Sequence, residues 1–104
     1  MELIKRLNEA KIVQDCLSWE ACIPERFWWG CLKERKLLDS YVDERYEWYE
    51  MSIIVFEIDE YIIGVKTITS LINPHISGLS LSDIKHTLEF FEMREVRKIT
   101  YKIK

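Results

Sequence analysis

Glycine is scarce in this 104-residue sequence, and the shortage excludes one class of function. The three glycines, Gly30, Gly64 and Gly78, stand far apart from one another. Loops that cradle phosphate groups need closely spaced glycines, because the backbone N–H groups must approach the ligand. The sequence therefore excludes a glycine-rich nucleotide-binding loop.

Metal ligands and disulfide partners are also few. The chain has three cysteines, Cys16, Cys22 and Cys31, and two histidines, His75 and His86. The cysteines are separated by five and eight residues, whereas paired zinc ligands lie about two to four residues apart. We expect buried, reduced cysteines, no metal site and no cofactor.

Long hydrophobic runs are absent. No apolar stretch approaches the roughly eighteen residues that a membrane-spanning helix needs, and the sequence shows no cleavable signal. We therefore expect no membrane association and a reducing cytoplasm as the location.

The residues that are present suffice for a folded core. Hydrophobic residues make up 48% of the chain and aromatic residues 12%, a composition typical of globular proteins. We expect a single domain over residues 1–104, with a helical part at 1–36 and a β-sheet part at 46–104.

Residues 48–71 are predicted to form two strands joined by a turn at Asp59-Glu60. In the first strand both alternating sets of side chains are apolar, so the strand is either covered on both sides or turned toward a partner. Gly64, inside the second strand, indicates a bulge or the close approach of another group.

The rest of the chain supplies helices and two more strands. Apolar residues spaced three and four apart predict a helix over residues 2–17, and Pro24 is placed to begin a second helix. Residues 37–43 are interpreted as a connection and 72–83 as a loop. Strands are predicted at 86–93 and 96–103. The outline is an α+β fold with N-terminal helices packed on a four-stranded antiparallel sheet.

Charge is unevenly distributed along the sequence. Between Asp43 and Glu60, seven acids stand against the single base Arg45, a local charge of −6. From Arg94 to the end, five bases stand against Glu95, a local charge of +4. The mild overall charge of −3 neither requires nor excludes nucleic acid, and we expect no direct contact with it.

The acidic stretch is also rich in aromatic residues, which are favoured anchors at protein interfaces. We predict a partner-binding surface whose members carry a carboxylate or an aromatic ring: Asp43, Glu44, Glu47, Trp48, Tyr49, Glu50, Asp59 and Glu60. A row of carboxylates could occupy the place of phosphates in a basic groove. The alternative is a solvated strand edge with the rings buried beneath it.

Catalytic signals are weak. Asp83 and His86 lie three residues apart with Ser80 and Ser82 nearby, but no G-x-S-x-G turn surrounds the serines. We expect no catalytic residues and no enzymatic activity. A small hydrolase or nuclease that uses Asp83 and His86 remains an alternative.

Several short motifs resemble small accessory proteins of phages and prophages of Gram-positive bacteria. They are W-Y-E at Trp48–Glu50, Gly64-Val65, S-L-S-D at Ser80–Asp83, E-F-F-E-M-R-E-V at Glu89–Val96 and Thr100-Tyr101, within roughly the last 60 residues. The resemblance implies expression in the host cytoplasm and inhibition of a host defence system, as anti-CRISPR proteins inhibit an effector nuclease.

Two main hypotheses follow. The first is a non-enzymatic, phage-derived binding protein that inhibits or modulates a host nucleic-acid enzyme, for example an anti-CRISPR protein acting on a Cas nuclease. The second is a structural or assembly protein whose two-faced strand builds a homodimer.

Overall fold

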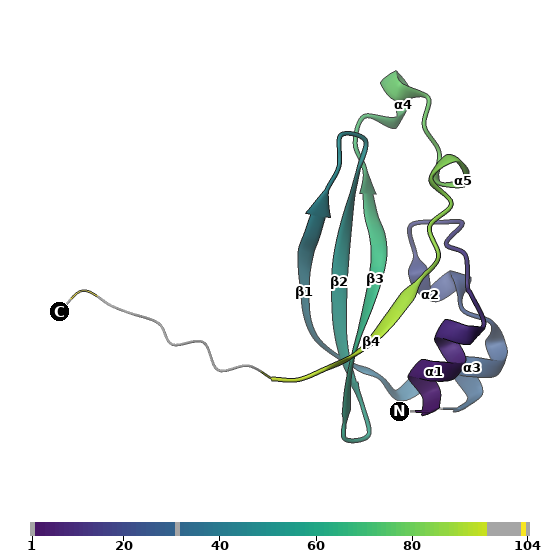
Figure 1. Ribbon diagram of the computed structural model, residues 1–104, viewed down its shortest axis with the longest axis vertical. Helices are drawn as coiled ribbons and strands as arrows, with labels where there is room; N and C mark the ends of the chain where they lie inside the picture. The colour runs from purple at the N-terminus through teal and green to yellow at the C-terminus, as the bar shows by residue number, and fades with distance from the viewer. Residues whose placement is uncertain (1, 31, 96–102, 104) are drawn as a thin grey trace.

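The computed structural model describes residues 2–30, 32–95 and 103, and its centre is an antiparallel sheet (Figure 1). Four strands lie in the order β1-β2-β3-β4. Their bounds are β1 Lys36–Arg45, β2 Tyr49–Ile58, β3 Tyr61–Leu71 and β4 Glu89–Met93. The helices are α1 Glu2–Glu9, α2 Trp19–Cys22, α3 Glu25–Gly30, the 3-10 helix η1 Leu32–Glu34, α4 Pro74–Ser77 and α5 Leu81–Ile84. The predicted α+β class is confirmed.

The central hairpin forms where it was predicted. β2 and β3 pair along their whole length, from Tyr49 opposite Leu71 to Ile58 opposite Tyr61. The turn falls at Asp59-Glu60, and Asp59 has a φ of 54°. This left-handed conformation suits aspartate better than most residues, because its short polar side chain can bond locally. The hairpin therefore closes without glycine.

One face of the sheet packs against the N-terminal helices. Phe56 of β2 is 1% exposed, and its ring stacks on Trp19 of α2 with centroids 5.7 Å apart. Leu7 of α1 and Phe27 of α3 belong to the same buried cluster. We call this the helix-covered face, and it holds most of the buried apolar side chains.

The first helix is shorter than predicted. A helix was expected over residues 2–17, but α1 ends at Glu9 and Lys11 has a φ of 49°. Beyond it the backbone bonds to a distant segment: Leu88 N–H donates to Ile12 O at 2.8 Å, and Val13 forms a β-bridge with Thr87. The apolar spacing continued past Glu9, but these long-range bonds and two β-branched residues favour extended backbone.

Two amide side chains of the N-terminal segment form hydrogen bonds with the sheet. Asn8 exchanges two hydrogen bonds of 2.9 Å with the backbone N–H and C=O of Phe90 in β4. The buried Gln14 exchanges two of 2.8 Å with the backbone of Ile68 in β3. Each side chain therefore forms the pair of hydrogen bonds that a neighbouring strand would otherwise form with this backbone.

Residues 37–43 are a strand and not the predicted connection. β1 pairs with β2 from Lys36 opposite Glu57 to Arg45 opposite Glu50. The register shifts twice, between Leu37 and Asp39 and between Val42 and Glu44. Each irregularity interrupts the two-residue alternation that identifies a strand in sequence.

The C-terminal predictions are partly corrected. The strand expected at 86–93 is confirmed only for its second part, as β4, and the loop expected at 72–83 contains α4 and α5. The strand expected at 96–103 falls almost entirely outside the described residues, and Ile103 is not in a strand. The fourth strand of the described sheet is therefore β1.

Candidate functional site

The eight predicted partner-binding residues lie at two ends of the sheet. Six are at the hairpin end that joins β1 to β2: Asp43, Glu44, Glu47, Trp48, Tyr49 and Glu50. Asp59 and Glu60 form the β2–β3 turn at the opposite end (Figure 1). Because ten residues of strand β2 separate the two turns, they lie about 30 Å apart. The structure thus brings six of these residues together and leaves two apart.

Cations partly neutralise the β1–β2 end. The Lys66 Nζ atom lies 3.0 Å from Glu44 Oε1 and 3.4 Å from Asp43 Oδ2, and Arg45 Nε lies 3.4 Å from Glu50 Oε1. With Glu47 included, four carboxylates face two cations, a formal charge of −2. The β1–β2 end is therefore acidic, but its net negative charge is smaller than the neighbouring residues in the sequence alone would give.

Two tyrosines pack against each other at the β1–β2 end. The rings of Tyr46 and Tyr49 stack with centroids 4.6 Å apart, and the Tyr46 hydroxyl donates a short hydrogen bond to Glu44. That donor, followed by Lys66, holds the pKa of Glu44 below its usual value, while the same bond raises the pKa of Tyr46. Glu44 is therefore ionised at neutral pH.

β1 carries an unusual row of exposed apolar side chains. Nine of its ten residues are exposed, and the large apolar ones are Leu37 at 67%, Leu38 at 43%, Tyr41 at 44% and Val42 at 42%. We call these four residues the apolar strip. Within the described chain, β1 has β2 as its one strand neighbour, so its other edge is unpaired. Sequence reasoning missed the strip because it treated these residues as a connection.

The sheet face opposite the helices holds a groove of about 730 Å³. Side chains alternate along β2, so Val55 points away from the face that contains Phe56. Val55, Tyr41 and Leu38 line the groove together with Ile62 of β3, Met93 and charged residues of both signs. We call this the open face. Leu38 and Tyr41 of the apolar strip line it, whereas Leu37 and Val42 pair with Phe56 and Ser52 and so point to the other face.

Gly64 lies on the open face beneath Met93. A Cβ atom at Gly64 would stand 2.9 Å from Met93 Cγ and Sδ, and 3.2 Å from Ile53 Cγ2. The predicted close approach of another group is therefore confirmed, and its reason is packing.

Asp83 and His86 have separate structural partners. The Ser80 backbone N–H and hydroxyl donate to Asp83 Oδ2 at 2.8 and 2.9 Å, which caps α5 and lowers the pKa of Asp83. The His86 Nε2 atom lies 3.0 Å from the Lys66 carbonyl oxygen. These contacts give both residues local roles in the fold.

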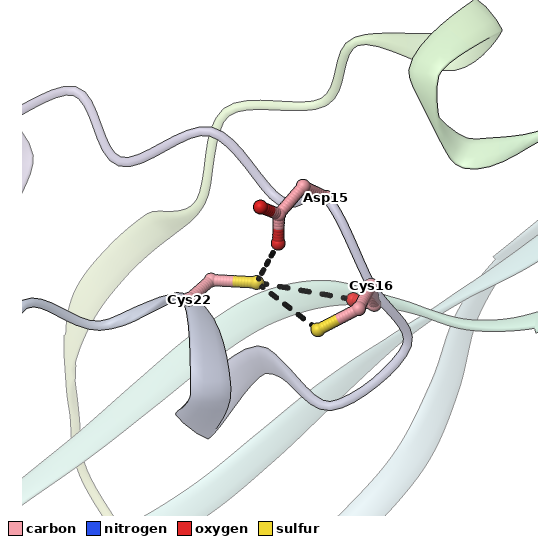
Figure 2. Close-up of side chains that lie close together, drawn as sticks. All are labelled: Asp15, Cys16 and Cys22. Carbon is pink, nitrogen blue, oxygen red and sulfur yellow. Dashed lines mark hydrogen bonds between the residues drawn. The ribbon is translucent and has the colours of Figure 1, made fainter.

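A cluster absent from the predicted sites joins Asp15, Cys16 and Cys22 (Figure 2). The Cys22 thiol donates to Asp15 Oδ1 at 3.1 Å and lies 3.6 Å from the Cys16 sulfur. Partial burial raises the pKa of Cys22 to about 11. Both cysteines are half-buried, not buried as expected, and Cys31 lies outside the described residues. The one signal in the sequence was the Asp-Cys pair before α2.

Two further findings bear on function. In the described ranges, no helix combines the length and hydrophobicity needed to cross a bilayer. The chain matches no family model, no curated protein and no solved structure. A functional proposal for this chain therefore starts from its own surface.

Proposed function

We propose that this chain is a non-enzymatic binding protein that docks a protein partner on β1. The observation that supports this function is the apolar strip, in which Leu37, Leu38, Tyr41 and Val42 are each more than 40% exposed. Single exposed apolar residues are ordinary, but four on one edge strand, distributed over both of its faces, favour an interaction surface along that strand. Tyr46 and Trp48, exposed at 44% and 42%, extend the row toward the hairpin end.

The charges around the strip define the chemistry of the partner. Asp39, Asp43, Glu44 and Glu47 lie on or beside β1, and among the described residues two of them, Asp43 and Glu44, share the cation of Lys66. An apolar centre with an acidic rim fits a partner whose apolar patch is bordered by lysine and arginine. Complementary charge of this kind raises the association rate and loses its effect as salt increases.

The partner class follows from this chemistry together with the phage resemblance of the sequence. Enzymes that act on nucleic acid carry basic grooves, which an acidic surface can occupy in place of phosphates. We therefore propose that the chain acts in the cytoplasm of a bacterial host as an inhibitor of a nucleic-acid enzyme, with a Cas nuclease as the first candidate.

A second copy of the chain is a less favourable occupant of β1. The unpaired edge of the strand could accept another β1, as in edge-to-edge dimers. In an antiparallel pairing centred on Tyr41, for example, Asp39 of one copy would lie opposite Asp43 of the other. Like charges disfavour this arrangement and favour a basic partner.

The test compares two valines. Val42 in the apolar strip is 42% exposed, and Val13 in the N-terminal segment is 54% exposed. Purified Cas nucleases from Gram-positive bacteria are immobilised, and binding and inhibition of DNA cleavage are measured for the wild type, Val42→Ser, Tyr41→Ala and Val13→Ser. We expect the first two substitutions to raise Kd about tenfold, the effect of losing an interface anchor, and Val13→Ser to leave it unchanged.

Two outcomes would contradict the proposal. If Val42→Ser and Val13→Ser weakened nuclease binding equally, β1 would not be the binding surface. A dimer in sedimentation velocity at low micromolar concentration, converted to a monomer by Val42→Ser, would assign β1 to self-assembly. Far-UV circular dichroism of each variant confirms that it is folded.

A further inference from the structure

Two segments that are separate in the sequence bring three possible ligand side chains together (Figure 2). Asp15 and Cys16 lie in the loop before α2, and Cys22 is the last residue of α2. The ligand atoms of these three side chains all lie within 4.8 Å of one another. The Ser18 carbonyl oxygen joins them, at 3.3 Å from the Cys16 sulfur and 3.6 Å from the Cys22 sulfur.

These distances are close to the edges of a tetrahedron around zinc. Zinc–sulfur bonds are about 2.3 Å long, so two sulfurs at tetrahedral positions lie about 3.8 Å apart. The Cys16 and Cys22 sulfurs are 3.6 Å apart, and the Cys22 sulfur and Asp15 Oδ1 are 3.1 Å apart. The Cys16 sulfur and the Asp15 carboxylate also lie within 4.8 Å of each other.

The backbone on both sides of the cluster is held in place. The buried Gln14 donates from Nε2 to the Cys16 carbonyl oxygen at 3.0 Å while it is bonded to Ile68 of β3. α2 is anchored by Trp19, which is 5% exposed and stacked on Phe56. The ligand residues thus extend from fixed supports, which lowers the conformational cost of binding.

We propose that Asp15, Cys16 and Cys22 form a binding site for a thiophilic divalent metal ion, with Zn²⁺ as the expected occupant. Two thiolates and one carboxylate supply three ligands, and the Ser18 carbonyl oxygen or a water completes the set. The ion would connect residues 15 to 22 and so stabilise the loop that positions Trp19.

Binding is a ligand exchange without oxidation or reduction. Two S–H bonds break, two metal–sulfur bonds form, and two protons pass to the solvent. The three ligands then carry a formal charge of −3 against the +2 of the ion, so the net charge of the site stays at −1, as it was with two thiols and one carboxylate. Isothermal titration in two buffers of different ionisation enthalpy counts the released protons.

Cobalt is the spectroscopic probe for the test. The full chain, kept reduced with a phosphine, is titrated with Co²⁺, and Zn²⁺ is then added to displace it. We expect a thiolate-to-cobalt charge-transfer band in the near ultraviolet, visible absorption of tetrahedral intensity, and loss of both bands with Zn²⁺.

Substitutions identify the ligands. We expect Cys16→Ser and Cys22→Ser each to weaken or remove the charge-transfer band, and the double substitution to abolish it. Asp15→Asn should weaken Zn²⁺ binding at least tenfold, since even outer-sphere partners contribute tenfold or more. Cys31→Ser is the matched control and should bind as the wild type does. Thermal unfolding without metal confirms that the variants are folded.

Three results would contradict the proposed metal site. The first is a folded, reduced wild type that shows no charge-transfer band with Co²⁺. The second is a band that survives in the Cys16→Ser/Cys22→Ser double variant. The third is a band lost in Cys31→Ser, since the ligand set would then differ from the one proposed.

Discussion

The two faces of the sheet come from the same strands, yet they differ in what covers them. On the helix-covered face, Phe56 and Ile63 are at most 1% exposed and pack with α1, α2 and α3. On the open face, Val55 and Tyr41 border a groove of about 730 Å³. The difference is one of cover: the helix-covered face holds most of the buried core, whereas Val55, 8% exposed, lines the groove of the face that we propose, with β1, for recognition.

The strongest test of this division removes a ring from each face. Phe56→Ala should lower the free energy of unfolding by about 3–5 kcal/mol, because it deletes a fully buried ring and leaves a cavity. Tyr41→Ala should lower it by less than about 1 kcal/mol, because the ring is half-exposed. Urea denaturation followed by circular dichroism measures both. Similar values for the two variants would refute the division.

A smaller loss of stability is expected when the hydrogen bonds between the N-terminal segment and the sheet are removed. Gln14→Ala should lower the free energy of unfolding by about 2–3 kcal/mol, because the backbone N–H and C=O of Ile68 lose their partners in a buried site. Hydrogen exchange provides a local measurement, in which the Ile68 amide should exchange faster. An unchanged exchange rate would mean that water replaces the amide.

On the open face, a larger side chain at Gly64 should lower the free energy of unfolding by less than Gln14→Ala does. Gly64→Val would overlap Met93, which must move, and overpacking of this kind costs about 1–2 kcal/mol. Met93→Ala in the same chain should restore part of that stability. The double-mutant cycle is measured by urea denaturation, and strictly additive effects would contradict the packing of Met93 on Gly64.

The smallest effect is expected from the surface ion pairs of Lys66. Glu44 has a lowered pKa when folded, so its contribution is present above its usual pKa of 4.5 and is lost as the pH falls through the folded value. Lys66→Met should therefore destabilise the protein slightly at pH 7 and less at pH 3. Thermal unfolding of both proteins at the two pH values measures this difference, and an effect larger at pH 3 would contradict it.

The sequence predicted those parts of the fold that depend on local pattern. The β2–β3 hairpin and its Asp59-Glu60 turn were visible, because runs of apolar, β-branched and aromatic residues flank the turn on both sides. β1 was missed because two register irregularities interrupt its alternation. The end of α1 at Glu9 was missed because the bonds of Ile12 and Gln14 go to residues more than fifty positions away.

The candidate sites were predicted less completely, for a similar reason. The acidic and aromatic residues at 43–50 are neighbours in the sequence, so their grouping was foreseeable, whereas the cation of Lys66 reaches them from another strand. The cluster of Asp15, Cys16 and Cys22 depends on how the loop before α2 turns back. Sequence spacing alone did not reveal that turn.

The paired bonds between Asn8 and Phe90 have a consequence for how the chain folds during synthesis. The β2–β3 hairpin can form by itself, because its contacts are local, but Asn8 must wait until Phe90 has left the ribosome. Until then α1 lacks its contact with β4, and apolar surface on the nascent hairpin is open to chaperones. The joining of these distant segments is therefore expected to be a late and rate-limiting event.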